Sequence, residues 1–344
     1  MEKRRLYALL LVSIVISLSL LGAYQYAHRE QYVLLSTTTS VDNTGLLDYI
    51  NAYLEENYKL SLRRTAVGTG MALLIASRGD VDACIVHAPS LEHSYRLKGY
   101  FLERKVIAYN FFILVGPEAD PANVSSSHTI LEAFYKIYLY GEEHHEKIFV
   151  SRGDNSGTHV KEKTLRNEMI KKYKLNVTYE EISQRPRYVS SGSGMSDTLM
   201  MASEYRAYTL SDIGTFLVMK KNASIDLKKL YAGDNYTINV YSIMVVKNAE
   251  HLDKAKRLAD FLASQGQALI AKYGVDEFGF PLFYPARPLL EAYKNHTLKP
   301  GSQEYVPPDL RRLGIDDLTL AQRIFNYAFW DVDGDGQIDR SSGW

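Results

Sequence analysis

The sequence predicts an α/β fold with two Rossmann-like lobes. Short apolar runs alternate with helical patterns along most of the chain, as in layered α/β folds. Ligands of such folds bind beyond the carboxyl ends of strands, and two sets of polar turns in that position suggest two lobes that face one cleft. Each of these turns is rich in Ser, Thr or Gly and is placed between a predicted strand and a predicted helix. They are at residues 36–40, 65–70, 151–159 and 188–194.

Length and composition are those of a globular protein with room for two domains. The chain has 344 residues, of which 46% are hydrophobic and 23% are charged, as in ordinary soluble domains. Lys and Arg number 40, as do Asp and Glu, and this zero net charge argues against nucleic acid as a partner. Cys84 is the only cysteine. A single cysteine excludes an internal disulfide, and the apolar neighbours of Cys84 predict a small buried side chain.

Residues 1–30 are predicted to be a signal or anchor segment. Lys3, Arg4 and Arg5 precede an uncharged run at residues 6–27, about the length that crosses a bilayer. Positive charge on the amino side predicts that the rest of the chain is extracytoplasmic, at the cell surface. The run is long for a signal-peptide core, and no small-x-small cleavage site stands out. We therefore expect a retained membrane anchor rather than a cleaved signal peptide.

The body begins with a predicted strand at residues 32–35. Hydroxyl side chains follow it, among them Thr38, Thr39 and Ser40, and an amphipathic helix is predicted over residues 46–54. A strand that leads through hydroxyl residues into a helix start brings donors to a place where anions bind readily.

The same order recurs in the next segment of the chain. The turn at residues 65–70 contains Thr69 and leads into a helix predicted at residues 71–76. Buried strands are predicted at residues 81–87 and 106–115, the second ended by a Gly-Pro pair.

The stretch at residues 151–159 is the most informative part of the chain. It follows an apolar run and opens a helical pattern, so we predict a strand, a polar turn and a helix start. The first N–H groups of a helix lack intrahelical partners and carry the positive end of the helix dipole. Gly157 would let an anion approach them, and Ser156 and Thr158 add hydroxyl donors.

Arg152 supplies a cation within this stretch. Its planar fork suits two oxygen atoms of a tetrahedral oxyanion, and Asp154 is placed to hold the fork in position. His159 is the only candidate base, and a lone His at a helix start is more often a capping or packing residue. The tetrapeptide Ser-Arg-Gly-Asp also occurs at residues 77–80 without the Ser-Gly-Thr that follows here, so only the longer pattern is informative.

The rest of the body continues the alternation of strands and helices. A glycine-rich turn at residues 188–194 precedes a helix predicted at residues 195–202. Strands are predicted at residues 207–210 and 238–246, and one long helix is predicted at residues 255–273.

These motifs resemble those of a known family, the tungstate-binding components of bacterial and archaeal ABC importers, which are type II periplasmic binding proteins. The resemblance covers roughly residues 32–288 and is strongest at residues 37–46 and 151–159. It implies two lobes joined by two strands, one crossing near residues 106–115 and the other near 238–246. The implied division is an anchor at 1–30, a first lobe at 31–112 and 237–298, a second lobe at 113–236, and a linker with an extension at 299–344.

The resemblance also implies a ligand site and a transport function. The ligand would be tungstate, with molybdate as the next candidate, and the protein would deliver it to an ABC permease with its ATPase. Neither a cofactor nor a catalytic residue is implied. The implied ligand-binding residues are Thr38, Thr39, Ser40 and Thr69 from one lobe and Arg152, Ser156, Gly157 and Thr158 from the other, with Asp154 in support.

The extension contains an acidic run that resembles a calcium loop. Its candidate ligands are Asp331, Asp333, Asp335, Gln337 and Asp339. Ser342 stands at the twelfth loop position, where a bidentate Glu belongs, so weak calcium binding and a solvated acidic tail both remain open.

Two classes of function compete on the residues alone. The first is a receptor for a tetrahedral oxyanion, which includes sulfate and phosphate as alternatives to tungstate. The second is an enzyme that acts on phosphate or sulfate esters. An enzyme would need a nucleophile beside a base, or metal ligands, and the polar turns contain neither. We therefore expect a binding protein that is not an enzyme.

Overall fold

The structure is a computed structural model that describes residues 11, 14–19, 31–234, 236–297, 320–322 and 324. Among these residues, no helix is both long enough and apolar enough to cross a membrane. Most of the predicted anchor at residues 6–27 and the whole calcium-like loop at residues 331–339 lie outside the described part of the chain.

A sheet of eight strands forms the centre of the body. Its strands follow the order β10-β4-β9-β3-β1-β2, and β7 and β8 also pair with β4. The strands are β1 (Gln31–Thr38), β2 (Leu60–Val67), β3 (Ala83–Val86), β4 (Phe101–Gly116), β7 (Thr209–Asp212), β8 (Lys228–Ala232), β9 (Ile238–Val246) and β10 (Tyr284–Pro285).

The sheet is mixed rather than parallel throughout. β1 pairs in parallel with β2 and β3, as the alternation of strands and helices predicts. β9 is antiparallel to both β3 and β4, and β7, β8 and β10 are antiparallel to β4. Within this sheet, the prediction of parallel layers was therefore correct only for the first strands. β9 differs because it returns from the far end of the molecule and so enters the sheet in the opposite direction.

Two long strands connect the two ends of the molecule. β4 pairs with β9 from Phe101 to Phe111, and from Phe112 to Gly116 it pairs with β7 and β8 instead. Every residue of β9 is buried. The predicted bounds of β9 were correct, whereas β4 begins five residues earlier than the apolar run at 106–115 indicates, because its first residues alternate between exposed and buried positions.

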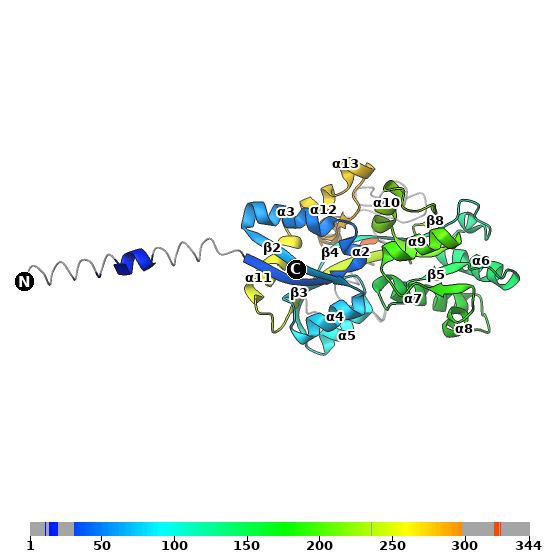
Figure 1. Ribbon diagram of the computed structural model, residues 1–344, viewed down its shortest axis with the longest axis horizontal. Coiled ribbons are helices and arrows are strands. Elements are labelled where there is room, and N and C mark those ends of the chain that lie inside the picture. Colours follow the sequence, from blue (N-terminus) through cyan, green and yellow to red (C-terminus); the bar gives the residue numbers. More distant parts are fainter. Residues whose placement is uncertain are drawn as a thin grey trace, which may run out of the picture.

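The first lobe packs its helices against β1, β2, β3 and the first half of β4. In Figure 1 this lobe occupies the left half of the body. One core cluster includes Val33, Leu35, Leu47, Ile243 and Leu258, all fully or almost fully buried. The helices are α2 (Thr39–Asp42), α3 (Leu46–Tyr58), α4 (Thr69–Arg78), α5 (Pro89–Leu97), α11 (Leu252–Leu262), α12 (Gly266–Lys272), α13 (Val275–Phe278) and α14 (Ala286–Lys294).

The single long helix predicted at residues 255–273 is in fact two helices, α11 and α12. The chain turns between them, and this turn lets the buried Gln267 side chain donate hydrogen bonds to the carbonyls of Ile107 and Leu262 at 2.7 and 2.6 Å. A buried amide must satisfy its donors. The apolar periodicity continues through the turn, which is why the sequence pattern did not reveal the break.

The second lobe surrounds the far half of β4 and forms the right half of the body in Figure 1. Its core includes Phe112, Leu114, Phe134, Phe149 and Leu165. A separate pair of parallel strands, β5 (Phe149–Ser151) and β6 (Tyr188–Ser190), lies within it. Its helices are η1 (Val124–Ser126), α6 (Ile130–Glu143), α7 (Gly157–Lys172), α8 (Tyr179–Ser183), α9 (Met195–Tyr205) and α10 (Ile213–Lys221).

Candidate functional site

The first arm of the candidate site is the junction of β1 and α2. Thr38 has extended backbone and caps α2, because its Oγ1 accepts a hydrogen bond from the N–H of Val41 at 3.3 Å. Its hydroxyl also lies 3.1 Å from the Ser40 hydroxyl. Both side chains are buried, whereas Thr39 between them is half-buried. The hydroxyl residues predicted from the sequence thus form one compact group at the end of β1.

The second arm is the loop between β5 and α7. Ser156 caps α7 by accepting a hydrogen bond from the N–H of His159 at 3.3 Å. The loop needs positive φ at Gly153 (66°) and Asn155 (55°). A Cβ on Gly153 would lie 1.7 Å from Ser190 Oγ, so only glycine fits beside β6.

Arg152 lies at the centre of this arm and is 2% exposed. Its Nη2 is 2.5 Å from Asp154 Oδ2 and donates a hydrogen bond to Thr39 Oγ1 at 3.2 Å. Asp154 Oδ1 accepts a further hydrogen bond from the N–H of Ser156 at 3.1 Å. Asp154 therefore fixes the guanidinium relative to the start of α7, and Arg152 reaches across to the first arm.

Several hydrogen bonds cross from one lobe to the other. The N–H of Gly157 donates to Thr69 Oγ1 at 2.8 Å, and the side-chain amide of Asn43 donates to Ser196 Oγ at 2.8 Å. Together with the bond between Arg152 and Thr39, they hold the two arms face to face in a closed arrangement. The structure thus brings together the hydroxyl groups, the cation and the two helix starts that were predicted separately.

Three buried groups of the second arm are available for further bonds. Within the part of the chain that the structure describes, Arg152 Nε, Arg152 Nη1 and Thr158 Oγ1 are buried and have no hydrogen-bond partner. Buried polar atoms are rarely left unsatisfied unless they serve a function. These three donors belong to the residues for which the sequence predicts anion binding.

Three of the helix-start N–H groups, in contrast, are already occupied. The Thr38 hydroxyl accepts a hydrogen bond from the N–H of Val41, and the Ser156 hydroxyl accepts one from that of His159. The Thr69 hydroxyl accepts one from the N–H of Gly157. Hydroxyl groups of the two arms therefore compete with a ligand for these three donors.

Sequence reasoning missed a buried histidine between the two arms. His87, which follows β3, lies 3.0 Å through its Nε2 from Ser40 Oγ and 2.9 Å through its Nδ1 from Asn239 Oδ1. Burial is the main reason why the pKa of His87 is lowered to about 4. The sequence placed His87 only at the end of the strand predicted at residues 81–87, and its hydrogen bond to Asn239 of β9 could not be read from the sequence.

Asp212 was also missed as a member of the site. It caps α10, where its carboxylate accepts hydrogen bonds from the N–H and Oγ1 of Thr215, both at 2.8 Å. Thr215 in turn donates to the Ser40 carbonyl at 3.3 Å. Burial raises the pKa of Asp212, while these hydrogen bonds and Arg152 oppose that effect.

His159 has a structural role in the second arm. Its Nδ1 accepts a hydrogen bond from the N–H of Asn155 at 2.9 Å, so the proton is on Nε2, which donates to Tyr179 Oη at 3.0 Å. Both ring nitrogen atoms are therefore used within the protein. This arrangement suits a residue that shapes the loop better than a general base.

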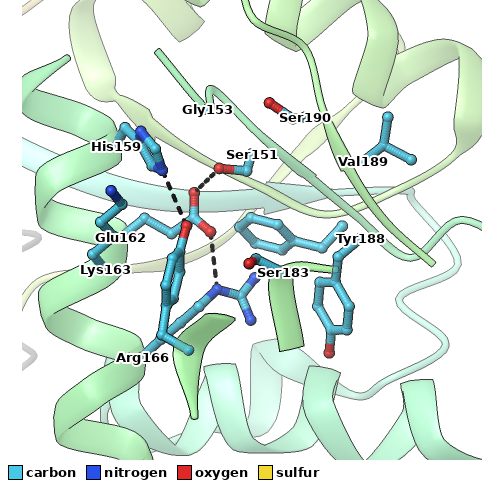
Figure 2. Close-up of a pocket in the computed structure, with 12 residues that line it drawn as sticks. Ser151, Gly153, His159, Glu162, Lys163, Arg166, Ser183, Tyr188, Val189 and Ser190 are labelled. Carbon is cyan, nitrogen blue, oxygen red and sulfur yellow. Dashed lines mark hydrogen bonds and ion pairs between the residues drawn. The ribbon is translucent and has the colours of Figure 1, made fainter. Parts of the chain in front are cut away.

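A cavity of about 250 Å³ lies behind the second arm. Figure 2 shows Glu162 between Ser151 and Arg166 within it. Glu162 accepts a hydrogen bond from Ser151 Oγ at 2.6 Å and one from Arg166 Nε at 2.9 Å. The Arg166 guanidinium also faces the rings of Phe149 and Tyr188, at 4.3 and 4.8 Å from their centroids. This buried ion pair supports β5, the strand that ends at the residue before Arg152.

Metal chemistry has no obvious place among these groups. No cluster of three or more His, Cys, Asp or Glu side chains in the described ranges could hold a metal ion. Cys84 is buried and unpaired, as its apolar neighbours predict, and burial raises the pKa of its thiol to about 12. The unpartnered donors of Arg152 and Thr158 are groups that can bind and orient an anion.

Comparison with known proteins also points to a binding protein. The family model of the PBP superfamily domain matches residues 24–265. The tungstate-binding protein of Peptoclostridium acidaminophilum is 36% identical over 271 residues, which cover 77% of this chain and 89% of that protein.

Solved structures are similar as well. The tungstate ABC transporter structure from Geobacter sulfurreducens is 36% identical with a TM-score of 0.61, and the match covers 71% of this chain and 99% of that one. The tungstate-binding protein from Desulfovibrio alaskensis G20 is 35% identical with a TM-score of 0.59, over 74% of this chain and 98% of that one.

Proposed function

We propose that this chain, which belongs to the periplasmic binding protein superfamily and to its family of tungstate-binding proteins, binds tungstate between its two lobes and delivers it to an ABC permease with its ATPase. Two of the relatives named above are described as tungstate-binding proteins, and the third is described as a tungstate ABC transporter. We therefore assign this chain a transport role rather than an enzymatic one.

The observation that carries the proposal is the state of Arg152. One guanidinium nitrogen is held by Asp154 and Thr39, while Nε and Nη1 are buried and free of partners among the described residues. A fixed planar fork with unused donors matches an oxyanion with several acceptor oxygen atoms. We propose that the ligand is held by Thr38, Thr39, Ser40, Thr69, Arg152, Ser156, Gly157 and Thr158, with Asp154 in support.

Protonation selects the class of anion. Phosphate near neutral pH carries a proton for part of the time, so its site benefits from a carboxylate that accepts this proton. Asp154 is engaged with Arg152 and Ser156, and Asp212 is engaged with Thr215. The remaining groups are mostly donors. We infer a doubly charged, unprotonated tetrahedral anion, and the relatives favour tungstate, with molybdate next.

The division of the chain and its location are part of the same proposal. We assign residues 31–112 and 237–298 to the first lobe and 113–236 to the second. The separate core clusters support this division, with the boundary residue Phe112 packed in the core of the second lobe. An extracytoplasmic location fits the relatives. Retention of an anchor at residues 6–27 and weak calcium binding at residues 331–339 rest on the sequence alone.

Calorimetry of the purified full-length chain tests the proposal. Tungstate and molybdate should bind more tightly than sulfate, and phosphate should bind most weakly. A preference for phosphate over tungstate would contradict the assignment of the ligand class.

A further inference from the structure

His87 lies between the two arms of the site, and each of its ring nitrogen atoms faces an oxygen atom. Nε2 is 3.0 Å from Ser40 Oγ, and Nδ1 is 2.9 Å from Asn239 Oδ1. The ring is 3% exposed and stacks on Tyr241 with centroids 5.0 Å apart. It also touches the second arm, because a Cβ on Gly157 would lie 2.7 Å from His87 Cε1.

The partners of Asn239 define the direction of the hydrogen bonds around His87. The Asn239 amide nitrogen donates to Asn110 Oδ1 at 3.0 Å and to Tyr241 Oη at 2.6 Å. Its oxygen is therefore the atom that faces His87, and it accepts the Nδ1 proton. In neutral His87 the Nε2 lone pair then accepts the Ser40 hydroxyl proton. Ser40 in this state offers lone pairs, not a proton, to an anion in the cleft.

A protonated His87 would reverse the role of Ser40 without moving any heavy atom. Both ring N–H groups would donate, one to Asn239 Oδ1 and the other to Ser40 Oγ. The Ser40 hydroxyl proton would then be free to rotate toward the cleft. The two oxygen neighbours thus accommodate imidazole and imidazolium equally well in geometry.

We propose that His87 takes up one proton from solvent when a dianionic oxyanion binds, and that this proton converts Ser40 from an acceptor into a donor to the anion. The inference rests on the proposed function, because it requires a doubly charged ligand in the cleft. The proton goes to Nε2, and the hydroxyl hydrogen of Ser40 turns from Nε2 to the anion.

The charges around His87 explain why a proton is needed. Arg152 is a single cation, and it is already paired with Asp154. The Arg104 guanidinium and the Glu92 carboxylate form a buried pair at 2.8 Å, so they add no net charge. A dianion would add two negative charges beside two ion pairs that carry no surplus of positive charge. The titratable or charged groups around His87 are Arg152 and Asp154 in the second arm, Lys161 on α7 beyond Phe112, Asp212 before α10, Tyr241 on β9, and the Arg104–Glu92 pair.

The lowered pKa of His87 is consistent with this role. Burial is the largest cause, Arg152 also lowers it, and the bond to Asn239 and the charge of Asp154 raise it. At neutral pH His87 is therefore neutral before the anion binds. Two negative charges beside the ring favour the charged form and raise the pKa. Between the pKa of the free site and that of the bound site, affinity should fall by about tenfold for each unit of rising pH.

The test is calorimetry of the full-length chain with sodium tungstate at pH 6.5, in two buffers that differ in their enthalpy of protonation. The dependence of the binding enthalpy on the buffer gives the number of protons taken up. Wild-type protein should take up a substantial fraction of one proton. His87→Gln has no imidazole to protonate and should take up none, while His145→Gln, at an exposed position outside both arms, should keep the uptake.

The outcomes separate the inference from the proposed function. Tungstate binding without proton uptake, or equal uptake by wild type and His87→Gln, would overturn the inference and leave the function intact. Failure of the wild-type protein to bind tungstate would contradict the function itself. If His87→Gln does not fold, ¹⁵N NMR of the wild-type imidazole groups decides. One buried histidine should become protonated at both nitrogen atoms only when tungstate is present, and the absence of such a change would refute the proposal.

Discussion

The Thr69 hydroxyl accepts a hydrogen bond of 2.8 Å from the backbone N–H of Gly157, although the two residues belong to opposite lobes. Thr69 is the first residue of α4 and Gly157 the first residue of α7, so two helix starts meet at this bond. Both groups are buried. The contact stabilises the closed arrangement directly, without a ligand between the partners.

Thr69→Val should therefore weaken tungstate binding. The substitution keeps the shape of the side chain but removes the acceptor for the Gly157 N–H, which costs about 1 kcal/mol for a typical hydrogen bond. This corresponds to roughly fivefold weaker binding, because closure and binding are coupled. Calorimetry measures the effect. Thr65→Val, at an exposed position of β2, is the matched control and should bind as wild type does. Equal affinity of both variants would show that this bond does not contribute to closure.

Arg152→Ala should reduce tungstate affinity by at least about tenfold. It removes a charge-assisted interaction of about 1.5 to 3 kcal/mol and leaves Asp154 without its partner. Arg152→Lys should restore only part of the affinity, because an ammonium group cannot hold Asp154 and fork toward an anion at once. Arg78→Ala is a suitable control. Arg78 is the arginine of the other Ser-Arg-Gly-Asp tetrapeptide, and it lies at an exposed helix end. Normal binding by Arg152→Ala would rule out this assignment of the site.

The sequence predicted the arms of the site better than the contacts between them. The strand ends and helix starts at Thr38, Thr69 and Ser156 are local features. Hydroxyl residues and glycines next to one another in the chain are enough to predict them. The pairing of His87 with Asn239 joins residues 152 positions apart. It depends on the antiparallel register of β3 and β9, which no local pattern encodes.

The same limit explains the error in the helix at residues 255–273. The turn between α11 and α12 is needed so that Gln267 can reach the Ile107 carbonyl on β4. Periodicity reports which residues are apolar, and it does not report which distant carbonyl a buried amide must satisfy.

Gly157→Ala should weaken binding by obstructing closure. The new Cβ would lie 2.7 Å from His87 Cε1 and 2.9 Å from the His87 carbonyl oxygen, so the start of α7 would have to move away from the first lobe. Small-angle scattering should show a smaller decrease in the radius of gyration on addition of tungstate. At Gly70, also near the lobe boundary, a Cβ would meet only Asn155 O at 3.8 Å. Gly70→Ala should therefore close normally, and identical behaviour of the two variants would contradict the steric explanation.

The ligand-free protein should lose stability as the pH falls from 6.5 toward 4. The pKa of His87 is about 4 in the folded protein against 6.5 for an ordinary histidine. The unfolded chain therefore binds more protons in this window, so stability rises with pH and is fully present above about 6.5. At pH 5 the loss from this residue should be on the order of 2 kcal/mol. Urea denaturation at pH 7.5 and 5.0 measures it. The free energy of unfolding of His87→Gln should differ less between the two pH values than that of wild type. An unchanged difference would exclude His87 as the source of the pH dependence.

Glu162→Gln should destabilise the protein strongly, because it breaks a buried ion pair. Glu162 and Arg166 are almost fully buried, with side-chain exposures of 4% and 2%, and their contact is 2.9 Å. Removal of one partner leaves an uncompensated buried charge, which typically costs about 3 to 5 kcal/mol. Glu118→Gln is the matched control: its pair with Lys228 is exposed, and its denaturation midpoint should match that of wild type.

The double variant Glu162→Gln/Arg166→Met separates the charge from the packing around it. Methionine keeps an apolar contact with Phe149 and Tyr188, which face the Arg166 guanidinium, and it leaves no charge to compensate. The double variant should therefore be more stable than Glu162→Gln alone, since a buried pair costs most when only one partner is removed. Urea denaturation of wild type, Glu162→Gln and the double variant measures their order of stability. If the double variant were the least stable, then loss of packing by the arginine, rather than the unpaired charge, would be the cause of the destabilisation.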